Sequence, residues 1–328
     1  MERARLVLRS VAPFLVALPV LWFVQGSLAS YTSFVVINIA VNVILAVSLN
    51  VVNGFTGQFS IGHAAFMAVG AYTAALVTTG LESLAIPGVP AAVSGQAVFL
   101  VALAVGMLAA SVAGLVVGIP TLRLRGDYLA IVTLGFGEII RVIIENTRVL
   151  GQATGISGLP ACTNVVWAGM GVVLTVVMAR RLLQSTQGRA LLAIREDEVA
   201  AEAMGVDTVG WKVRAFVISA AFAGLAGALL VHKIQLVTPR MFTFVKSMEV
   251  VVMVVLGGMG SITGSIVAAA VLTIALETLQ AADQYRMVIF SMLLIVLMLT
   301  RPSGLFGTRE IWDVLPRWRR RRAPGEAP

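Results

Sequence analysis

The chain has 328 residues, with a hydrophobic fraction of 59% and a charged fraction of only 12%, where a soluble domain carries roughly 25% charged residues. A water-soluble globule of this composition would lack the polar side chains needed to cover its surface. The formal net charge of +8 would suit a nucleic-acid partner, but basic residues gather at both ends beside apolar runs, where they suit anionic lipid headgroups better. We therefore expect contact with membrane lipid and no nucleic acid.

Apolar runs follow one another along the whole chain. A membrane-spanning helix needs about 20 apolar residues, and the runs cover 11–29, 31–52, 62–80, 97–119, 128–146, 163–181, 213–233, 249–258, 262–281 and 285–300. They are long and continuous rather than short and alternating, which argues against a membrane barrel. The sequence predicts an all-α polytopic membrane protein over 1–328, a single transmembrane domain of about 8–10 helices.

Basic residues in short loops predict the orientation. The N-terminus, the segment 184–212 and the basic tail 301–328 should be cytoplasmic, which requires an even number of crossings. A second apolar run follows the first almost at once, so we expect an uncleaved first span rather than a signal peptide. Arg240 and Lys246 then fall in an outer loop, an exception that the sequence does not explain.

The run 249–258 is too short to cross a membrane of normal thickness. Gly257 and Gly258 end it, which predicts a short or broken helix near 249–260 whose freed backbone is shielded by neighbouring helices. A similar Gly/Ser cluster precedes the helix expected after His63. Paired glycine-broken segments mark substrate paths in many transporters, although chance similarity explains the two stretches equally well.

A polar cluster lies between the second and third runs. Unwound backbone with Asn and Gln side chains can line a polar path through a membrane. We assign to such a substrate pathway the residues Asn53, Gly57, Gln58, Gly62, His63, Gly257 and Gly258. A cytoplasmic or interfacial turn explains the cluster around 50–63 equally well, and His63 alone suits packing better than proton transfer.

The longest polar internal segment is 184–212. Acidic residues and Gly205 predict a short helix from Glu196 to Met204, ended by that glycine. A solvated connector without a function is the alternative.

No enzymatic motif occurs in the sequence. None of the three lysines follows a glycine as the P-loop lysine must, so another chain would hydrolyse any ATP used. HExxH and GxSxG motifs are absent, and the single Cys162 provides neither a disulfide framework nor a metal-ligand set. We expect a transporter subunit without a catalytic residue, metal or cofactor of its own.

Ionisable residues within the expected spans leave a second transporter class open. An ion-driven secondary transporter would depend on Glu138 or Glu249. Glu138 and Arg141 are spaced i,i+3 and can simply pair, while Asn38 and Asn42 are spaced i,i+4 for hydrogen bonds between helices. An intramembrane enzyme would need a catalytic motif that the sequence lacks.

Five blocks, taken in order, resemble the bacterial ABC permeases for branched-chain amino acids, of the LivM type. The blocks are SLNVVNGFTGQFSIGHAAFMAVGAYTAA (48–75), GDYLAIVTLGFGEIIR (126–141) with TGISGLP (154–160), GRALLAIREDEVAAEAMGVDTVGWKVRAFVISAAFAGLAGAL (188–229), VVMVVLGGMGSITGSIVAAAVL (251–272) and RPSGLFG (301–307). This resemblance implies leucine, isoleucine and valine as cargo. Urea, short amides and other hydrophobic or aromatic acids are alternatives within the same family.

The resemblance also implies partners and a coupling site. Members work as a LivH-like and LivM-like pair with two cytoplasmic ATPases, which bind the ATP, and a periplasmic substrate-binding protein, in the inner membrane. The segment 196–205 resembles the loop that docks on the ATPase, with Glu198, Glu202, Ala203 and Gly205 as its coupling residues. The Ile-x-Leu-Pro ending of other importers is absent, so the detailed docking geometry does not carry over.

Overall fold

The computed structural model describes residues 13–14, 17–26, 29–81, 91–122, 128–279 and the single positions 292, 295, 304, 305, 307 and 310. After a helix at Ala17–Gly26, the helices are α2 (Ser30–Asn53), α3 (His63–Leu81), α4 (Ala91–Thr121), α5 (Tyr128–Asn146), α6 (Val165–Gln184), α7 (Thr186–Glu196), α8 (Glu198–Ala203), α9 (Thr208–Ile234), α10 (Phe244–Gly257) and α11 (Ile262–Thr278). The described structure also contains the short 3-10 turns η1 (Arg148–Leu150), η2 (Gln152–Thr154) and η3 (Pro239–Phe242) and the strands β1 (Ile156–Ser157) and β2 (Leu236–Val237).

The all-α polytopic prediction is confirmed. Among the described residues, five helices are long and apolar enough to cross a membrane: α2, α3, most of α4, α6 and α9. Ala17–Gly26 and α11 are shorter apolar helices. The expected span at 285–300 and the basic tail at 301–328 lie outside the described residues, apart from the isolated positions named above.

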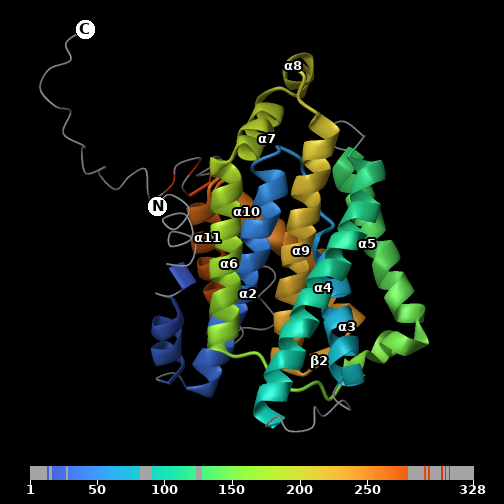
Figure 1. Cartoon of the computed structure of the whole chain (residues 1–328), viewed down its shortest axis with the longest axis vertical. Coiled ribbons are helices and arrows are strands. Elements are labelled where there is room, and N and C mark those ends of the chain that lie inside the picture. The colour runs from blue at the N-terminus through green and yellow to red at the C-terminus, as the bar shows by residue number, and fades with distance from the viewer. Residues whose placement is uncertain are drawn as a thin grey trace, which may run out of the picture.

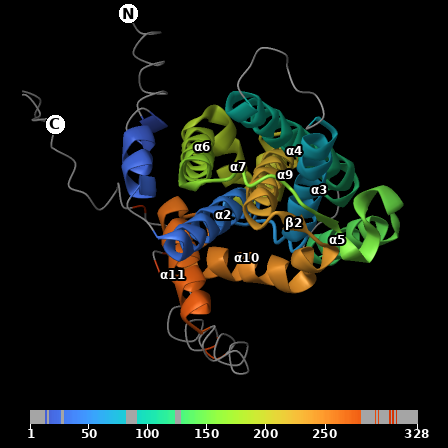
Figure 2. The ribbon, with the colours of Figure 1, turned by 90° about the horizontal axis from the view of Figure 1, so that it is seen from below.

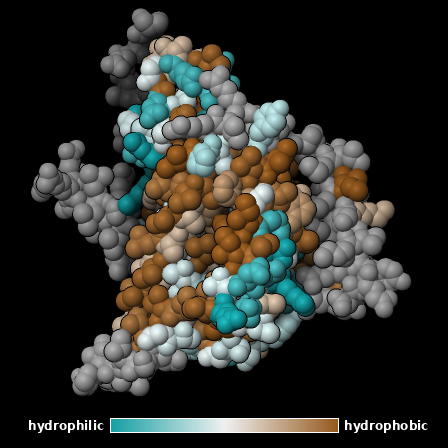
Figure 3. All heavy atoms as spheres, turned by 90° about the vertical axis from the view of Figure 1, so that its right-hand side faces the viewer, coloured by the Kyte–Doolittle hydropathy of each residue, from teal (hydrophilic) through white to brown (hydrophobic). Residues whose placement is uncertain are grey.

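Helices α2 and α9 form the centre of the bundle, and the other long helices surround them (Figures 1 and 2). Their most apolar windows are 78% buried, against 33% for α4 and α6. On α4 the exposed apolar side chains Leu108, Val112 and Val116 repeat every four residues, which places them on one helix face. Hydrophobic side chains cover much of the surface in Figure 3, as a lipid-facing protein requires.

Glycines bring α3, α4 and α9 into close contact. A Cβ on Gly106 would lie 2.8 Å from the carbonyl oxygen of Gly70, and a Cβ on Gly224 would lie 2.9 Å from that of Gly106. Small residues at such crossings let helix backbones approach in membranes. The bundle is therefore packed through backbone as well as through side chains.

The short helix before the glycine cluster is confirmed as α10, which begins at Phe244, earlier than the sequence pattern indicates. Its backbone turns at Gly258, where φ is +106°, and Ser261 then caps α11 by accepting a hydrogen bond from the Gly264 N–H. The chain thus breaks between two helices where glycine alone tolerates such dihedral angles cheaply.

The prediction that Lys246 lies in a loop is wrong, because this residue lies in the first turn of α10 and its ammonium group donates to Asn42 of α2; its place on the outer side stays a prediction. The Ser247 hydroxyl oxygen accepts a hydrogen bond from the Ala64 N–H, at 3.1 Å. That amide belongs to the first turn of α3, which also begins after a non-helical segment, 57–62. Two helices therefore start inside the bundle with their N-termini in contact, and neighbouring helices shield the non-helical backbone.

Candidate coupling site

The polar segment after α6, residues 184–212, is called the coupling segment. It folds into two short helices at one end of the molecule, the coupling end, where α8 projects beyond the long helices (Figure 1). Asp197 separates α7 from α8 and caps α8 by accepting hydrogen bonds from the N–H groups of Val199 and Ala200, at 2.9 and 3.0 Å. Gly205 follows with φ at +82°. The predicted short helix and its terminating glycine are confirmed, whereas α7 is an element that the sequence analysis missed.

Two of the predicted coupling residues make internal contacts. Glu198 lies 2.5 Å from the ammonium group of Lys212, whose side chain is 1% exposed. Glu202 accepts a hydrogen bond from the hydroxyl of Thr208, at 2.8 Å. A buried ammonium without a partner would be strongly destabilising. The two acids therefore hold α8 against the start of α9 and fix its direction.

The outer side of α8 is apolar and exposed. Val199 is 64% exposed and Met204 is 84% exposed, and Ala203 and Gly205 are exposed beside them. Apolar groups gathered on an otherwise polar protrusion commonly mark a protein-protein contact. The geometry leaves this side free for another chain, while the contacts of Glu198 with Lys212 and of Glu202 with Thr208 hold the helix from the other side.

Arg195, in the last turn of α7, connects this segment to the bundle. Its Nη1 donates a hydrogen bond to the carbonyl oxygen of Gly54, at 3.0 Å. A Cβ added at Gly57 would lie 3.0 Å from its Cγ, and one added at Gly260 would lie 2.6 Å from its Nη1. The arginine thus lies between both glycine-rich turns. The sequence analysis missed this residue, because its role depends on a contact 141 positions away along the chain.

The two glycine-rich turns are joined to each other by Asn50. Its amide Nδ2 donates to the carbonyl oxygen of Ser261, at 3.0 Å, and its Oδ1 accepts from the Gly260 N–H, at 2.9 Å. The side chain is completely buried. The two stretches that look alike in the sequence are therefore in contact at the same end of the bundle, beside the coupling segment.

Residues from beyond the last described helix return to this turn. The Leu305 N–H donates to the carbonyl oxygen of Leu256, at 2.7 Å. Glu310 accepts hydrogen bonds from the N–H groups of Ile262 and Thr263, at 2.6 and 3.1 Å, where a carboxylate complements the positive end of the helix dipole. Positions 305 and 310 thus lie at the same end as the coupling segment.

The predicted pathway residues differ in their surroundings. Gly57 and Gln58 border a cavity of about 290 Å³ between residues 56–59 and the stretch 194–198 of the coupling segment. The other five are buried in packed contacts: for example, His63 Nε2 lies 2.9 Å from Ser48 Oγ, and a Cβ on Gly62 would lie 3.0 Å from the carbonyl carbon of Thr133. A role in substrate passage remains a prediction for all seven.

Apolar spanning helices, a projecting polar segment and turns buried beside it define the chain as a multi-pass membrane protein. Residues 31–299 match the family described as branched-chain amino acid transport system, permease component. The chain belongs to this family.

Named relatives agree with this assignment. The chain is 38% identical to the high-affinity branched-chain amino acid permease protein LivM of Escherichia coli, over 80% of this chain and 67% of that protein. It is 26% identical to BraD of Pseudomonas aeruginosa, over 83% and 93%, and 35% identical to LivH of Escherichia coli, over 40% and 42%. No solved structure matches the chain.

Proposed function

We propose that this chain is one permease subunit of a heterodimeric ABC importer that moves leucine, isoleucine and valine inward across a bacterial inner membrane. Its partners are a second, LivH-like permease, two cytoplasmic ATPases that bind the ATP, and a periplasmic substrate-binding protein. The names of the relatives support the cargo. Similarity to both LivM and LivH suits a pore built from two related chains.

The observation that carries the coupling role is the projecting α8. Its exposed apolar side, with Val199 and Met204, provides a contact surface for an ATPase. The ion pair of Glu198 with Lys212 holds α8 on α9. The hydrogen bond from Arg195 to the Gly54 carbonyl links a displacement of α7 to the turn that follows α2. A rigid movement of the ATPase can therefore shift the ends of α2 and α10, which is what alternating access between two states requires.

The orientation follows from this role. An ATPase lies in the cytoplasm, so α8 faces the cytoplasm. The contact between Leu305 and Leu256 and the capping by Glu310 support a cytoplasmic side for the start of the C-terminal tail as well. The N-terminus faces the cytoplasm as well, given an even number of crossings.

The test uses the complete transporter in proteoliposomes. Met204→Asp should lower ATP-driven leucine uptake at least about tenfold, as loss of a central interface contact of about 1.4 kcal/mol would, while the two permeases still purify together. Met204→Leu keeps the apolar volume and should keep uptake. Equal uptake by both variants would contradict docking through α8.

The same preparation tests the cargo and the energy source. Uptake of urea or short amides but not leucine would move the assignment to the alternative cargoes within the family. Uptake that survives ATP depletion and fails with ionophores would favour an ion-driven transporter. The observed pairing of Glu138 with Arg141, at 2.8 Å, instead supports a structural role for that carboxylate.

A further inference from the structure

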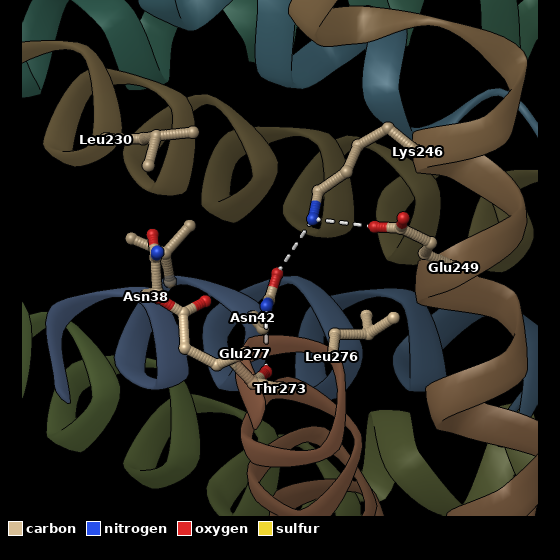
Figure 4. Close-up of a pocket in the computed structure, with 9 residues that line it drawn as sticks. Asn38, Asn42, Leu230, Lys246, Glu249, Thr273, Leu276 and Glu277 are labelled. Carbon is tan, nitrogen blue, oxygen red and sulfur yellow. Dashed lines mark hydrogen bonds and ion pairs between the residues drawn. The ribbon is translucent and has the colours of Figure 1, made fainter. Parts of the chain in front are cut away.

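A polar cavity of about 120 Å³ lies among α2, α10 and α11, away from the coupling segment. Its lining combines two asparagines of α2, a lysine and a glutamate of α10, and a threonine and a glutamate of α11 (Figure 4). Val41, Leu230 and Leu276 form an apolar wall beside these polar groups. Charged and apolar surfaces thus share one small hollow.

The polar groups form a connected chain. Lys246 Nζ lies 3.1 Å from Glu249 Oε2 and donates to Asn42 Oδ1 at 3.0 Å. The same asparagine donates through Nδ2 to the Thr273 hydroxyl, at 2.9 Å, and that hydroxyl donates to the Ala269 carbonyl. Figure 4 shows the lysine of α10 pointing toward the asparagine of α2, and the glutamate of α10 pointing toward the lysine. The direction of the asparagine amide is therefore fixed, with its oxygen toward the ammonium group.

The charges in this cavity do not cancel. One ammonium, that of Lys246, faces two carboxylates, those of Glu249 and Glu277. Glu277 receives a hydrogen bond from the Tyr31 hydroxyl, at 3.4 Å, rather than an ion pair among the described contacts. The side chains of Lys246 and Glu249 remain about one fifth exposed, at 21% and 20%. Charged groups at membrane depth are costly and ordinarily face a water-filled path or a neighbouring protein.

A zwitterion complements this arrangement. A carboxylate can replace Glu249 as the partner of the Lys246 ammonium, and the released Glu249 can bind the ammonium of the ligand together with Glu277. An aliphatic side chain would lie on Val41, Leu230 and Leu276. A cavity with few, well-placed polar groups and an apolar wall is the usual form of a small-molecule site.

We propose that this cavity is a binding subsite for the zwitterionic head of an α-amino acid on its way through the permease, with Lys246 on the carboxylate and Glu249 with Glu277 on the ammonium. The inference rests on the proposed function, because it supplies the substrate contact within the same transport path.

The test measures equilibrium binding of radiolabelled leucine to the complete complex of permeases and ATPases, in vesicles of phosphatidylglycerol, which lack zwitterionic headgroups. Leucinamide lacks the carboxylate and 4-methylpentanoate lacks the ammonium. Each should compete at least about tenfold more weakly than leucine, the ratio that about 1.4 kcal/mol produces. Equal competition by leucine and either analogue would overturn the proposal. Displacement of the bound leucine by sodium or potassium ions alone would also overturn it.

Variants separate binding from folding. Lys246→Met should remove the preference for leucine over leucinamide, whereas Lys233→Met, on α9 outside the cavity, should keep it. The double exchange Lys246→Glu with Glu249→Lys restores an ion pair but reverses its direction, so the preference for leucine over leucinamide should stay lost. A restored preference in the exchange, or an unchanged preference in Lys246→Met, would overturn the subsite.

The wild-type complex distinguishes failure of the subsite from failure of the proposed function. ATP-driven leucine uptake without an effect of Lys246→Met on binding contradicts the subsite alone. Absence of ATP-driven leucine uptake by wild type, with its substrate-binding protein present, contradicts the proposed cargo.

Discussion

The turn at the coupling end and the cavity among α2, α10 and α11 both contain an asparagine of α2, but they use it differently. Asn50 is completely buried and bonded to two backbone groups of the α10–α11 turn. Asn42 is bonded to the side chains of Lys246 and Thr273 beside an open cavity. Backbone bonds in a packed site hold one geometry, whereas side-chain bonds beside a cavity can exchange partners.

This difference suits two separate roles on one helix, a rigid contact at Asn50 and exchangeable contacts at Asn42. Eight residues of α-helix separate the two asparagines, about 12 Å along the axis. The coupling turn can therefore move as a rigid unit with Arg195, while the cavity changes its contacts in response. Coupling between two sites needs such an element, whose position both of them influence.

The largest effect is expected at the contact between the coupling segment and the turns. Arg195→Met removes the hydrogen bond to the Gly54 carbonyl and should lower ATP-driven uptake by about 5- to 150-fold, the range of a coupling free energy of about 1–3 kcal/mol. ATP hydrolysis by the complex should persist. Arg189→Met, at an exposed position of the same helix, should keep both activities. Equal uptake by the two variants would contradict the role of the hydrogen bond between Arg195 and Gly54 in coupling.

A smaller effect separates the two asparagines. Asn50→Leu leaves the partly buried Gly260 N–H without this partner, which costs about 1–3 kcal/mol for an unsatisfied group, whereas the Ser261 carbonyl still accepts from the N–H and hydroxyl of Ser265. Asn42→Leu should cost less, because water in the cavity can reach its former partners. Thermal unfolding of the purified complexes measures both. A larger loss of stability in Asn42→Leu than in Asn50→Leu would contradict the conclusion that the turn is held more firmly than the cavity.

The smallest effect concerns the glycine that follows α8. Gly205→Ala forces a Cβ into a left-handed backbone conformation, at a cost of about 1–2 kcal/mol, without a clash within 4 Å. Gly135→Ala, inside α5 with equally open surroundings, should instead stabilise the helix by up to about 1 kcal/mol. The unfolding temperature, measured against wild type, should therefore fall in Gly205→Ala and rise or stay unchanged in Gly135→Ala; a rise in Gly205→Ala would contradict the strain at the end of α8.

Local patterns predicted the elements of this protein better than its contacts. Long apolar runs suffice to predict α2, α6 and α9, and the acids before Gly205 predict α8, because these signals lie within a few neighbouring residues. The i,i+3 spacing of Glu138 and Arg141 likewise predicts their observed pair.

Contacts between distant segments could not be predicted in this way. Nothing near Arg195 in the sequence indicates the Gly54 carbonyl, and nothing near Lys246 indicates Asn42. Lysine in a stretch between apolar runs ordinarily indicates a loop outside the membrane. Inside this bundle, Glu249 on the same helix compensates its charge, while Asn42 of α2 reaches the ammonium group only when the helices are packed.

The central claim is that α8 faces the cytoplasm and contacts the ATPase. Met204→Cys in a Cys162→Ser background, which leaves one thiol in the 328-residue chain, tests it directly in cells that contain the whole transporter. The account predicts that a membrane-impermeant maleimide added to intact cells does not label the thiol, and that a short bifunctional cross-linker joins it to the ATPase. Labelling from outside, or cross-linking to the periplasmic binding protein instead, would contradict it.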